Sequence, residues 1–483
     1  MYYNNLTMLA DLYELTMMQG YLLTNTHEKQ VVFDLFYRTN PLGNGYAICA
    51  GLEQAIEYIK NLHFCESDID YLKSKGIFKE EFIEYLRNFK FQGDVYAIPE
   101  GSVVFPQEPL LRVKASVIEA QLIESALLNI VNHQSLIATK AARVVYAAGG
   151  DSVLEFGLRR AQGPDAAIYG ARAAVIGGCK STSNVASGKM FDIPISGTHA
   201  HSWVMSFPDE LTAFREYANL YPDMCILLVD TYNTLKIGVP NAITVFNELK
   251  AKGHKLANYG VRLDSGDLAY LSKKVREMLD SAGFEDAIIS ASSDLDEDLI
   301  TSLKSQGSKI TLWGVGTNLI TSKGWQAFGG VYKLSAEITE NSVAPKIKLS
   351  ENPEKITNPG IKTVFRLYDK KNNKIQADLI SLYDEKINEN EDLTIFHPIN
   401  TWKKMTLKAG TYSVRDLLVP VFLNGQCVYD SPSVGEIAEY CNNEKETLWE
   451  ESKRLVNPHG VPVDLSLKLY ELKRDMINEI RGE

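Results

Sequence analysis

Cysteine is scarce in this sequence and follows no recognisable spacing. The 483 residues include six cysteines, and none of them stands in a CxxC pair or a similar motif. Zinc sites need closely spaced Cys and His ligands, and disulfide frameworks need a dense cysteine pattern in a small secreted chain. The spacing therefore argues against both and favours reduced thiols in the cytoplasm.

Basic residues are not in excess either. The chain has 50 Lys and Arg against 61 Asp and Glu, which gives a formal net charge of −11. A nucleic-acid surface requires clustered positive charge, so we expect no nucleic-acid partner. Small anions remain possible ligands, because a local pocket of Arg and Lys can exist on an acidic protein.

Long hydrophobic runs and low-complexity tracts are lacking as well. The apolar N-terminal stretch contains Asp11 and Glu14 and has no basic leader, so it fits neither a signal peptide nor a membrane span. With 45% hydrophobic and 23% charged residues, the composition is that of an ordinary globular protein. The length predicts two or three domains.

Residues 1–150 predict a mixed region of helices and strands. Leu9, Leu12, Tyr13 and Met17 recur at helical spacing, which predicts an amphipathic helix over residues 6–23. The further expected elements are a strand at 31–38, a helix at 50–62, short antiparallel strands between 94 and 115, and a long helix at 117–148.

Residues 151–335 follow a different rhythm, in which short strand-like runs alternate with helical patterns. The seven runs are VLEF, KSTSN, IPISGT, CILLVD, YGVRLD, AIISAS and ITLWGV. Such alternation predicts parallel strands with crossover helices, and seven repeats fit an α/β barrel better than a small open sheet. The carboxyl ends of barrel strands form the catalytic face. The residues that follow these strands are Arg159, His201, Asp230, Arg262, Asp264, Asp294, Gly314 and Gly316.

Residues 336–483 are polar and rich in Lys, Asn and Glu. KTVFRLYD and ADLISLYD predict strands of β-hairpins that return to the first region. EKETLWEESKRL and VDLSLKLYELKRDMINEI predict charged surface helices.

Two adjacent arginines stand in EFGLRRAQGPDAA (155–167), after a strand and before a helix start. Guanidinium groups grip carboxylate or phosphate in bidentate fashion, so Arg159 and Arg160 are candidates for an anion site. A surface turn whose arginines pair with nearby acids is an equal alternative. Phe156 beside them is more often a core residue than a stacking platform.

Two histidines, His199 and His201, lie two residues apart in ISGTHAHSW (195–203). No third ligand is spaced nearby, which makes a metal site the weaker interpretation. A neutral imidazole is a competent nucleophile toward a phosphoryl group. Asp230, at the end of CILLVD, could fix its tautomer, although an Asp at a strand end is also a common helix cap.

Two further segments suit a sugar phosphate. In GVRLDSGDL (260–268), Arg262 and Asp264 point to one side of a strand, and a carboxylate there can accept hydrogen bonds from a ribose diol. Asp267 is more simply a helix N-cap. LWGVGTNLITS (312–322) predicts a strand, a glycine turn and a helix, an arrangement that lets backbone N–H groups approach a phosphate.

Taken together, these segments resemble nicotinate phosphoribosyltransferase, a type II phosphoribosyltransferase family. The matching motifs, in order, are ADLYELTM, FYRTNP, EFGLRRAQGPDAA, STSN, GTHAHS, LLVDTYNT, VRLDSGD and WGVGTN. Their order and spacing are specific up to about residue 335, and the match is looser beyond. The resemblance implies an α/β fold with an irregular α/β barrel (151–335) packed with a second α+β domain, formed from the N- and C-terminal segments 1–150 and 336–483. It also implies a homodimer with shared active sites.

The resemblance implies a role for single residues at the pyridine ring and at the histidine. Phe156 and Tyr13 of the partner subunit would enclose the pyridine ring, and Arg159 would meet its carboxylate. His201 would be the histidine that ATP phosphorylates, with Asp230 orienting it.

The remaining implied contacts concern phosphoribosyl diphosphate. Arg38 and Asp11 would bind the diphosphate across the dimer, and Mg²⁺ is expected on it with no protein ligand assigned. The other expected substrate-binding residues are Thr198, Arg262, Asp264, Gly314, Gly316 and Thr317. The implied reaction forms nicotinate mononucleotide and diphosphate, coupled to ATP hydrolysis, in the salvage branch of NAD biosynthesis.

Ser183 bears on the choice of substrate. Relatives that use nicotinamide carry an aspartate where Ser183 stands in KSTSN. An aspartate accepts a hydrogen bond from an amide but repels a carboxylate, so serine favours nicotinate. A second departure from the family pattern is Lys180-Ser181, where many nicotinate enzymes have Asp-Gly.

Two other functions compete with this interpretation. A lyase or isomerase acting on a sugar phosphate would share the phosphate loop, but it normally needs a Lys or Glu base at a strand end, and the sequence offers no such candidate. A non-catalytic binding protein with this fold would not require His201 and Asp230.

Overall fold

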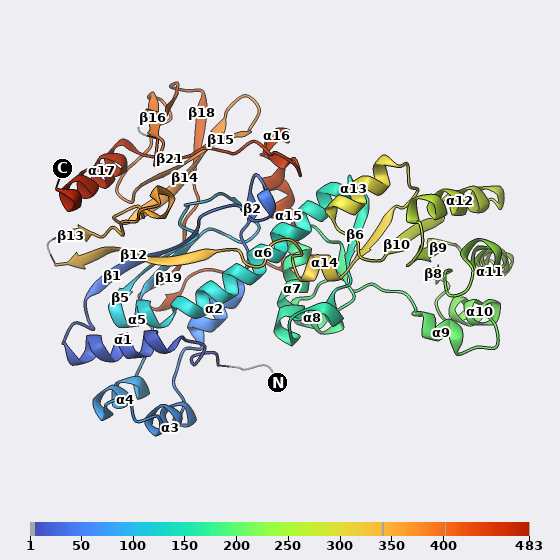
Figure 1. Cartoon of the computed structure of the whole chain (residues 1–483), viewed down its shortest axis with the longest axis horizontal. Coiled ribbons are helices and arrows are strands. Elements are labelled where there is room, and N and C mark those ends of the chain that lie inside the picture. Colours follow the sequence, from blue (N-terminus) through green and yellow to red (C-terminus); the bar gives the residue numbers. More distant parts are fainter. Residues whose placement is uncertain (1–4, 341, 401, 483) are drawn as a thin grey trace. The chain divides into compact units, whose positions relative to one another are not determined.

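The computed structural model describes residues 5–340, 342–400 and 402–482, which form two compact units (Figure 1). Unit 1 comprises Met1–Leu136, Ala327–Pro432 and Glu439–Glu483, and unit 2 comprises Ile137–Gln326 and Ser433–Ala438. Both ends of the chain thus belong to unit 1. The units divide inside α6 (Glu124–Ala148), whereas the boundary expected at residue 150 lies just beyond the end of that helix.

The larger sheet of unit 1 draws its strands from three distant parts of the chain. In spatial order they are β13 (Ser342–Pro345), β12 (Gly330–Thr339), β1 (Gln30–Tyr37), β5 (Leu111–Ser116), β3 (Asp94–Ala97), β19 (Val419–Leu423) and β20 (Gln426–Cys427). All neighbours in it are antiparallel. β1 is buried along nearly its whole length, which explains its continuous apolar sequence. Its one charged residue, Asp34, is neutralised by Lys362 at 2.8 Å.

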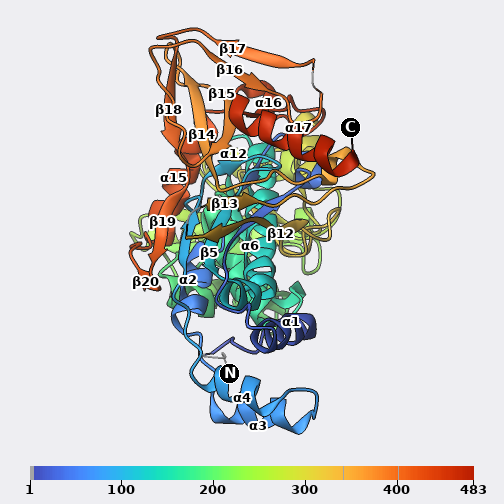
Figure 2. The ribbon, with the colours of Figure 1, turned by 90° about the vertical axis from the view of Figure 1, so that its left-hand side faces the viewer.

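A second, mixed sheet of unit 1 comes entirely from the C-terminal part of the chain. Its strands, in spatial order, are β17 (Lys404–Leu407), β16 (Leu393–Phe396), β21 (Val463–Leu465), β15 (Ile375–Leu382), β14 (Lys362–Asp369) and β18 (Tyr412–Asp416). α17 (Leu467–Arg481) packs against β15 and β16 (Figure 2). A two-stranded sheet joins β2 (Ala47–Ile48) and β4 (Val103–Val104).

The remaining helical elements of unit 1 follow the predictions in part. They are α1 (Leu12–Leu23), η1 (Pro41–Gly43), α2 (Leu52–Lys60), α3 (Glu66–Ser74), α4 (Glu80–Arg87), α5 (Val117–Leu122), η4 (Pro353–Lys355), α16 (Glu450–Lys453) and, from Glu439 onward, α15 (Val434–Glu446). The helix predicted at 117–148 is divided into α5 and α6. The helix predicted at 444–455 is the end of α15 followed by α16, because Trp449 interrupts it and donates its indole N–H to the Ile375 carbonyl at 2.7 Å.

The helix predicted near the N-terminus is present as α1, but its buried face is not the predicted one. Leu12 and Tyr13 are 59% and 44% exposed, and Leu9 and Met17 are exposed too. The buried face instead carries Glu14 and three apolar residues that follow it at Leu15, Met18 and Leu22. Glu14 can be buried because it accepts backbone N–H groups from Ser125 at 2.8 Å and from Asp11 at 3.1 Å.

Unit 2 is built on a six-stranded parallel sheet that follows the order of a barrel. The strands are β8 (Met224–Leu228), β9 (Asn258–Leu263), β10 (Ile288–Ser292), β11 (Leu312–Val315), β6 (Ser152–Glu155) and β7 (Ser181–Thr182). This order is cyclic in sequence, and β7 and β8, its two ends, do not pair within the described part of the chain. The run IPISGT, predicted as a strand, contributes only one bridge, from Ile195 to Thr182, since Pro194 cannot donate to a ladder.

Helices connect these strands, as the alternating pattern predicts. They are η2 (Leu158–Arg160), α7 (Pro164–Gly177), α8 (Val185–Phe191), α9 (His201–Met205), α10 (Glu210–Leu220), η3 (Thr234–Gly238), α11 (Val239–Ala251), α12 (Leu268–Ser281), α13 (Glu297–Ser305) and α14 (Thr317–Ile320). The fold is therefore α/β, with an incomplete α/β barrel in unit 2 and an α+β unit formed from both chain ends.

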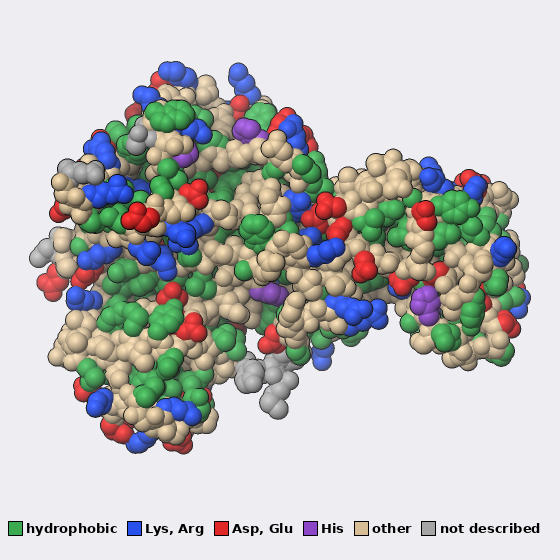
Figure 3. Space-filling view, in the orientation of Figure 1, with side chains coloured by type: hydrophobic (Ala, Val, Ile, Leu, Met, Phe, Trp, Pro, Cys, Tyr) green, Lys and Arg blue, Asp and Glu red, His purple; other side chains and the backbone are tan. Residues whose placement is uncertain are grey.

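Two features of the helices and surface complete this description. No helix in the described ranges is both long and apolar enough to cross a membrane. On the visible face of each unit, Lys and Arg side chains are interspersed with Asp and Glu (Figure 3).

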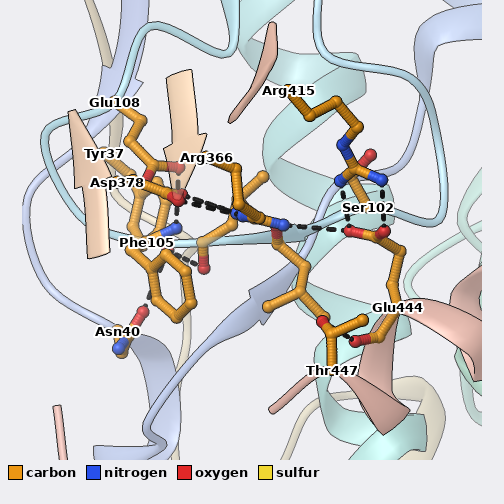
Figure 4. Close-up of polar contacts among 12 residues, drawn as sticks. Tyr37, Asn40, Ser102, Phe105, Glu108, Arg366, Asp378, Arg415, Glu444 and Thr447 are labelled. Atoms are coloured by element: carbon orange, nitrogen blue, oxygen red, sulfur yellow. Dashed lines mark hydrogen bonds and ion pairs between the residues drawn. The ribbon is translucent and has the colours of Figure 1, made fainter. Parts of the chain in front are cut away.

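A buried arginine joins the N- and C-terminal segments inside unit 1. Arg366 on β14 is fully buried and binds both carboxylate oxygens of Asp378 on β15, at 2.6 Å in the shortest contact. It also donates to Glu444 on α15 at 2.9 Å and to the Val103 carbonyl at 2.8 Å. Its guanidinium lies 5.3 Å from the centre of the Phe105 ring (Figure 4). One side chain thus connects four segments of the chain.

The charges in this cluster balance only if one carboxyl group is protonated. Arg415 binds Glu444 with two nitrogens, at 2.8 and 3.0 Å, so two arginines face Asp378 and Glu444. Glu108 lies beside Asp378 as a third acid (Figure 4). Burial raises the pKa of Glu108 well above its ordinary value, and Asp378 adds to this shift. A proton on Glu108 can be donated to Asp378.

We expect Glu108→Gln to become more stable relative to the wild type as the pH rises. Because the folded-state pKa of Glu108 is raised, its contribution to stability is present below the unfolded pKa and is lost as pH rises toward the folded pKa. Glutamine keeps the shape and a donor but cannot ionise. Urea unfolding between pH 5 and pH 9 should show the difference growing by up to about 1.4 kcal/mol per pH unit for as long as Glu108 stays protonated in the folded protein.

The exposed Glu351 provides the matched control, since Glu351→Gln should leave the pH profile of unfolding unchanged. A constant difference between Glu108→Gln and the wild type across the range would show that Glu108 is not protonated in the folded protein.

Candidate functional site

The carboxyl ends of the unit 2 strands surround a cavity of about 330 Å³. Its lining consists of Phe156, Leu158, Arg159, Ser183, Gly197, Thr198, His199, Ala200, His201, Leu228, Arg262 and Asp264. Most of the site residues that the sequence predicts in unit 2 therefore lie around one cavity. They meet because parallel strands of a barrel end at the same face.

Phe156 forms part of the cavity wall and depends on a neighbouring glycine. A Cβ atom on Gly314 would lie 2.7 Å from Cδ2 of the Phe156 ring, so only glycine leaves room for the ring there. We predicted that Gly314 lets a phosphate approach the backbone. In the structure, glycine is needed at this position because the Phe156 ring occupies the space of a side chain. Gly316 and Thr317 follow at the start of α14, and among the described residues no acceptor is found for their backbone N–H groups.

Glu155 organises this wall, although it is not among the site residues predicted from the sequence. It is fully buried at the end of β6 and accepts hydrogen bonds from the Gly157 backbone N–H and from the Thr182 hydroxyl at 2.5 Å. Burial raises its pKa. Its backbone carbonyl accepts the Ser183 N–H at 2.9 Å. Glu155 thus fixes the turn after Phe156 and the segment that carries Ser183. The sequence signal that could have identified Glu155 is its position as a charged residue inside the apolar strand VLEF.

Arg159 lies on the exposed turn η2 and lines the cavity. Within the described ranges, the guanidinium groups of Arg159 and Arg160 have no hydrogen-bond or ion-pair partner, so the alternative of arginines paired with surface acids does not hold. An unpaired guanidinium at a cavity is suited to a carboxylate or a phosphate.

Arg262 and Asp264 project together, as their two-residue spacing predicts. Arg262 donates to Asp264 at 2.9 Å, to the Thr198 hydroxyl at 2.8 Å and to the Ser292 hydroxyl at 2.7 Å. The Ser292 hydroxyl in turn donates to Asp264. Ser292 ends β10 and was not predicted; its position at a strand end, like that of the other site residues, could have identified it.

The strand end after Ser292 is conformationally strained. Ser293 and Asp294 have φ angles of 134° and 44°, which non-glycine residues rarely adopt. The Asn318 side chain holds the Asp294 carbonyl at 2.6 Å and so ties this turn to α14. Strain of this kind is retained where surrounding contacts impose it, commonly at functional sites.

The two histidines have different environments. His199 is buried, accepts the Leu228 backbone N–H at its Nε2 (3.2 Å), and its Nδ1 faces the Ala200 carbonyl at 3.4 Å. Burial lowers the pKa of His199 to about 4, so it is neutral with both nitrogens engaged. The His201 side chain is 40% exposed, and its Nε2 lies 3.8 Å from Asp264. Of the pair, only His201 presents a ring nitrogen to the cavity.

The group that orients His201 is not the predicted one. Asp230 was expected to bind the imidazole, but its Oδ2 accepts the Asp264 backbone N–H at 2.9 Å and the Ser265 hydroxyl at 2.6 Å. The Nδ1 of His201 instead contacts the Thr231 hydroxyl at 3.0 Å. Asp230 therefore braces the turn after β9, and Thr231, its neighbour in the chain, orients the histidine.

Three predicted residues belong to unit 1. Asp11 caps α1 and accepts a hydrogen bond from the Ser125 hydroxyl at 3.2 Å. Tyr13 is exposed on the same helix, and partial burial raises its pKa to about 12. The Nε of Arg38 is buried and has no hydrogen-bond partner in the described chain. Their assignment to the cavity of another subunit stays a prediction.

One carboxylate oxygen near the cavity is buried without a hydrogen-bond donor among the described residues. No group of three His, Cys, Asp or Glu side chains among the described residues is arranged to hold a metal ion by itself. Oδ1 of Asp230, however, is buried and no described residue donates to it. An ion whose other ligands come from a bound substrate or water suits such an oxygen.

Comparison with protein-family models and known proteins places these observations in context. Residues 8–132 match the nicotinate phosphoribosyltransferase N-terminal domain, residues 152–379 the nicotinate phosphoribosyltransferase family, and residues 361–473 the C-terminal domain. A nicotinate phosphoribosyltransferase of Bacillus subtilis (strain 168) is 48% identical over 99% of this chain and 96% of its own length. One of Homo sapiens is 31% identical over 96% and 95%.

Solved structures agree with these matches. The crystal structure of human nicotinic acid phosphoribosyltransferase superposes with a TM-score of 0.84 at 30% identity and covers 96% of this chain and 99% of that chain. A nicotinate-nucleotide pyrophosphorylase from Pyrococcus furiosus, at 23% identity, shares the fold with a TM-score of 0.70 over 91% of this chain and 95% of that chain.

We expect Gly314→Ala to displace the Phe156 ring. The added methyl group would overlap the ring at 2.7 Å, and overpacking of this kind costs about 1–3 kcal/mol. The measurements are the free energy of unfolding in urea and a crystal structure of the variant. Gly460→Ala is the control, because nothing lies within 4 Å of a Cβ there. A native ring position with unchanged stability would contradict the role given to Gly314.

Proposed function

This chain belongs to the nicotinate phosphoribosyltransferase family and acts as an enzyme of NAD biosynthesis, and we propose that it joins nicotinate to phosphoribosyl diphosphate in the unit 2 cavity and couples this reaction to ATP hydrolysis through a phosphohistidine at His201. The observation that carries the proposal is the convergence of an aromatic ring, an unpaired arginine and a free imidazole nitrogen on one cavity. The cavity alone would admit many anions; the family restricts the choice to a pyridine carboxylate.

The nicotinate site is assigned to the wall that Glu155 organises. The Phe156 ring offers a flat apolar face to the pyridine, and the unpaired Arg159 guanidinium is free to bind the carboxylate. Ser183, held through its backbone by Glu155, places a neutral hydroxyl where an aspartate would repel an acid. Tyr13 of the partner subunit would cover the other face of the ring.

The phosphoribosyl group is assigned to the strand ends opposite. Asp264 is held in place by Arg262 and by Ser292, and its Oδ2 remains available to a ribose hydroxyl. The open N–H groups of Gly316 and Thr317 are suited to the 5′-phosphate. Mg²⁺ supplied with the diphosphate would neutralise the leaving group, and the Asp230 carboxylate, whose Oδ1 has no donor among the described residues, would be the nearby protein group to meet it.

Displacement of diphosphate then has a physical basis in these residues. The reaction passes through an oxocarbenium-like state, so the Asp264 carboxylate and the positive groups at the diphosphate stabilise charge where it develops. Holding the pyridine nitrogen over the anomeric carbon supplies proximity.

His201 is assigned as the phosphoryl acceptor. If its Nδ1–H donates to the Thr231 hydroxyl, the Nε2 lone pair faces the cavity. Nε2 attacks the terminal phosphorus of ATP, and ADP leaves with the electrons of the broken P–O bond. His199 cannot compete, because its Nε2 accepts the Leu228 N–H.

The exposed apolar residues of α1 support a homodimer. Leu12, Tyr13 and Met17 on α1, and Leu9 just before it, are exposed. An exposed apolar patch of this kind commonly marks a protein interface. In the proposed dimer, this face would bring Asp11, Tyr13 and Arg38 to the neighbouring subunit's cavity. We place the enzyme in the cytoplasm, in keeping with its six free cysteines.

The alternative of a sugar-phosphate lyase or isomerase is weakened by the state of Glu155. It is a glutamate at a strand end, as such a reaction would require, but it is fully buried and both of its oxygens accept hydrogen bonds. It cannot reach a substrate proton.

Substrate choice should depend on Ser183. We expect the wild type to prefer nicotinate over nicotinamide, and Ser183→Asp to lower kcat/KM for nicotinate at least about tenfold, because two carboxylates would share the site. Steady-state kinetics with both bases measures this. Ser183→Asn, which adds similar volume without charge, should lose less. Equal use of both bases by the wild type would contradict the assignment.

ATP labelling should separate the two histidines. With radiolabelled ATP, the wild type should carry an acid-labile, base-stable phosphoryl group, and His201→Asn should lose it while keeping some ATP-independent transfer. Thr231→Val should slow labelling about tenfold or more through loss of the imidazole orientation, and Thr231→Ser should restore it. Label that persists in His201→Asn and vanishes in His199→Asn would identify the other histidine as the acceptor.

A further inference from the structure

A second cavity lies in unit 1, formed by η4, the loop after β16 and the outer part of α17. Its volume is about 220 Å³, and its apolar lining comes from Pro353, Ile356, Pro398, Ile399, Tyr470 and Ile477. This is roughly the volume that seven water molecules occupy in the liquid. It therefore suits a ligand of about that many non-hydrogen atoms. All of its residues lie in unit 1, so it is not part of the unit 2 site.

A lysine with no counter-ion lines this apolar cavity. Lys473 is four residues after Leu469 and shares its buried face of α17, and only 6% of it is exposed. Its ammonium donates to the Asn358 side-chain oxygen at 2.9 Å, and no carboxylate among the described residues pairs with it. A buried ammonium needs a counter-charge, and here two of its three N–H donors lack an acceptor.

The charged groups around Lys473 do not supply the missing negative charge. Lys362 on β14 acts on Lys473 as a like charge and is itself paired with Asp34. His397, at the end of β16, also lies within electrostatic reach. Burial and the neighbouring Lys362 lower the pKa of Lys473 to about 8, so it remains mostly charged at pH 7. Arg474, the next residue of the helix, forms an ion pair with Asp475 at 2.9 Å, so that carboxylate does not pair with Lys473.

We propose that this cavity binds a small aliphatic monocarboxylate, whose chain fills the apolar lining and whose carboxylate pairs with Lys473. Arg474 and Asn478 also line the cavity beside Lys473. The apolar part of the lining is aliphatic apart from Tyr470, which favours an alkyl chain over a flat ring. One uncompensated ammonium favours a single negative charge over a phosphate or a diphosphate. The site is independent of the nicotinate cavity and of the reaction assigned to it.

Hexanoate is the probe, because its eight non-hydrogen atoms match the cavity. Isothermal titration calorimetry on the full-length wild type should show binding of hexanoate at pH 7 and no binding of hexanamide, its neutral analogue. Because only the charged lysine pairs with the carboxylate, affinity should be about tenfold lower at pH 9 than at pH 7. Both comparisons use unaltered protein, so they remain decisive even if a variant is unstable.

Variants then locate the site. Lys473→Met keeps the length of the side chain without its charge and should abolish hexanoate binding. Lys468→Met, an exposed lysine on the same helix, should leave it unchanged. Absence of hexanoate binding, equal binding of hexanamide, an affinity that does not change with pH, or full binding by a folded Lys473→Met would each overturn the proposal. Hexanoate that inhibits transferase activity in competition with nicotinate would place it in the other cavity and overturn it as well.

Discussion

The fully buried ion cluster around Arg366 is the constraint on which unit 1 depends. A guanidinium without water must have its charge and its donors satisfied by the protein, and here the partners are Asp378, Glu444 and the Val103 carbonyl. Removing one member of such a cluster leaves the others charged and buried, at a cost of about 3–5 kcal/mol. The N-terminal strand β4, strands β14 and β15 and the C-terminal helix α15 are therefore held together by one side chain.

Unit 2 has a different constraint. Its strands follow the order of a barrel, but β7 and β8 do not pair in the described chain, and several site residues lie in the segment between them. Between β7 and β8 the chain makes one β-bridge at Ile195 before it reaches His199. No ladder positions this stretch, so side chains do so instead: the imidazole of His199 holds the Leu228 backbone, and Thr198 binds Arg262. His199 is thus fixed by hydrogen bonds, whereas His201, two residues later, keeps a ring nitrogen free for chemistry. One histidine of the pair has a structural role and the other has the proposed chemical role.

Much of the fold was predictable because its signals are local. The strand KTVFRLYD coincides with β14, and the alternating runs give the barrel strands whose ends carry Arg262 and Asp264. The structure differs from the sequence-based predictions where contacts between residues far apart in the sequence decide the outcome. The buried face of α1 depends on the hydrogen bonds of Glu14, and the need for glycine at 314 depends on the Phe156 ring. His201 contacts Thr231 because Asp230 is already hydrogen-bonded to the turn after β9. The positions of Asp11, Tyr13 and Arg38 relative to the cavity remain predictions, since they depend on a second subunit.

The division of the chain between the two units has a consequence for synthesis on the ribosome. Apart from Ser433–Ala438, unit 2 is one continuous stretch, whereas unit 1 needs residues from both ends. The nascent chain can form the barrel strands while the N-terminal strands still wait for β14, β15 and α15. Until β12 is made, one edge of the largely apolar β1 has no partner strand, and until Lys362 on β14 is made, Asp34 lacks its counter-charge. Exposed edges of this kind are prone to aggregate. The C-terminal third of the chain thus completes the fold of the N-terminal third. We expect the incomplete nascent chain to depend on chaperones more than the finished protein does.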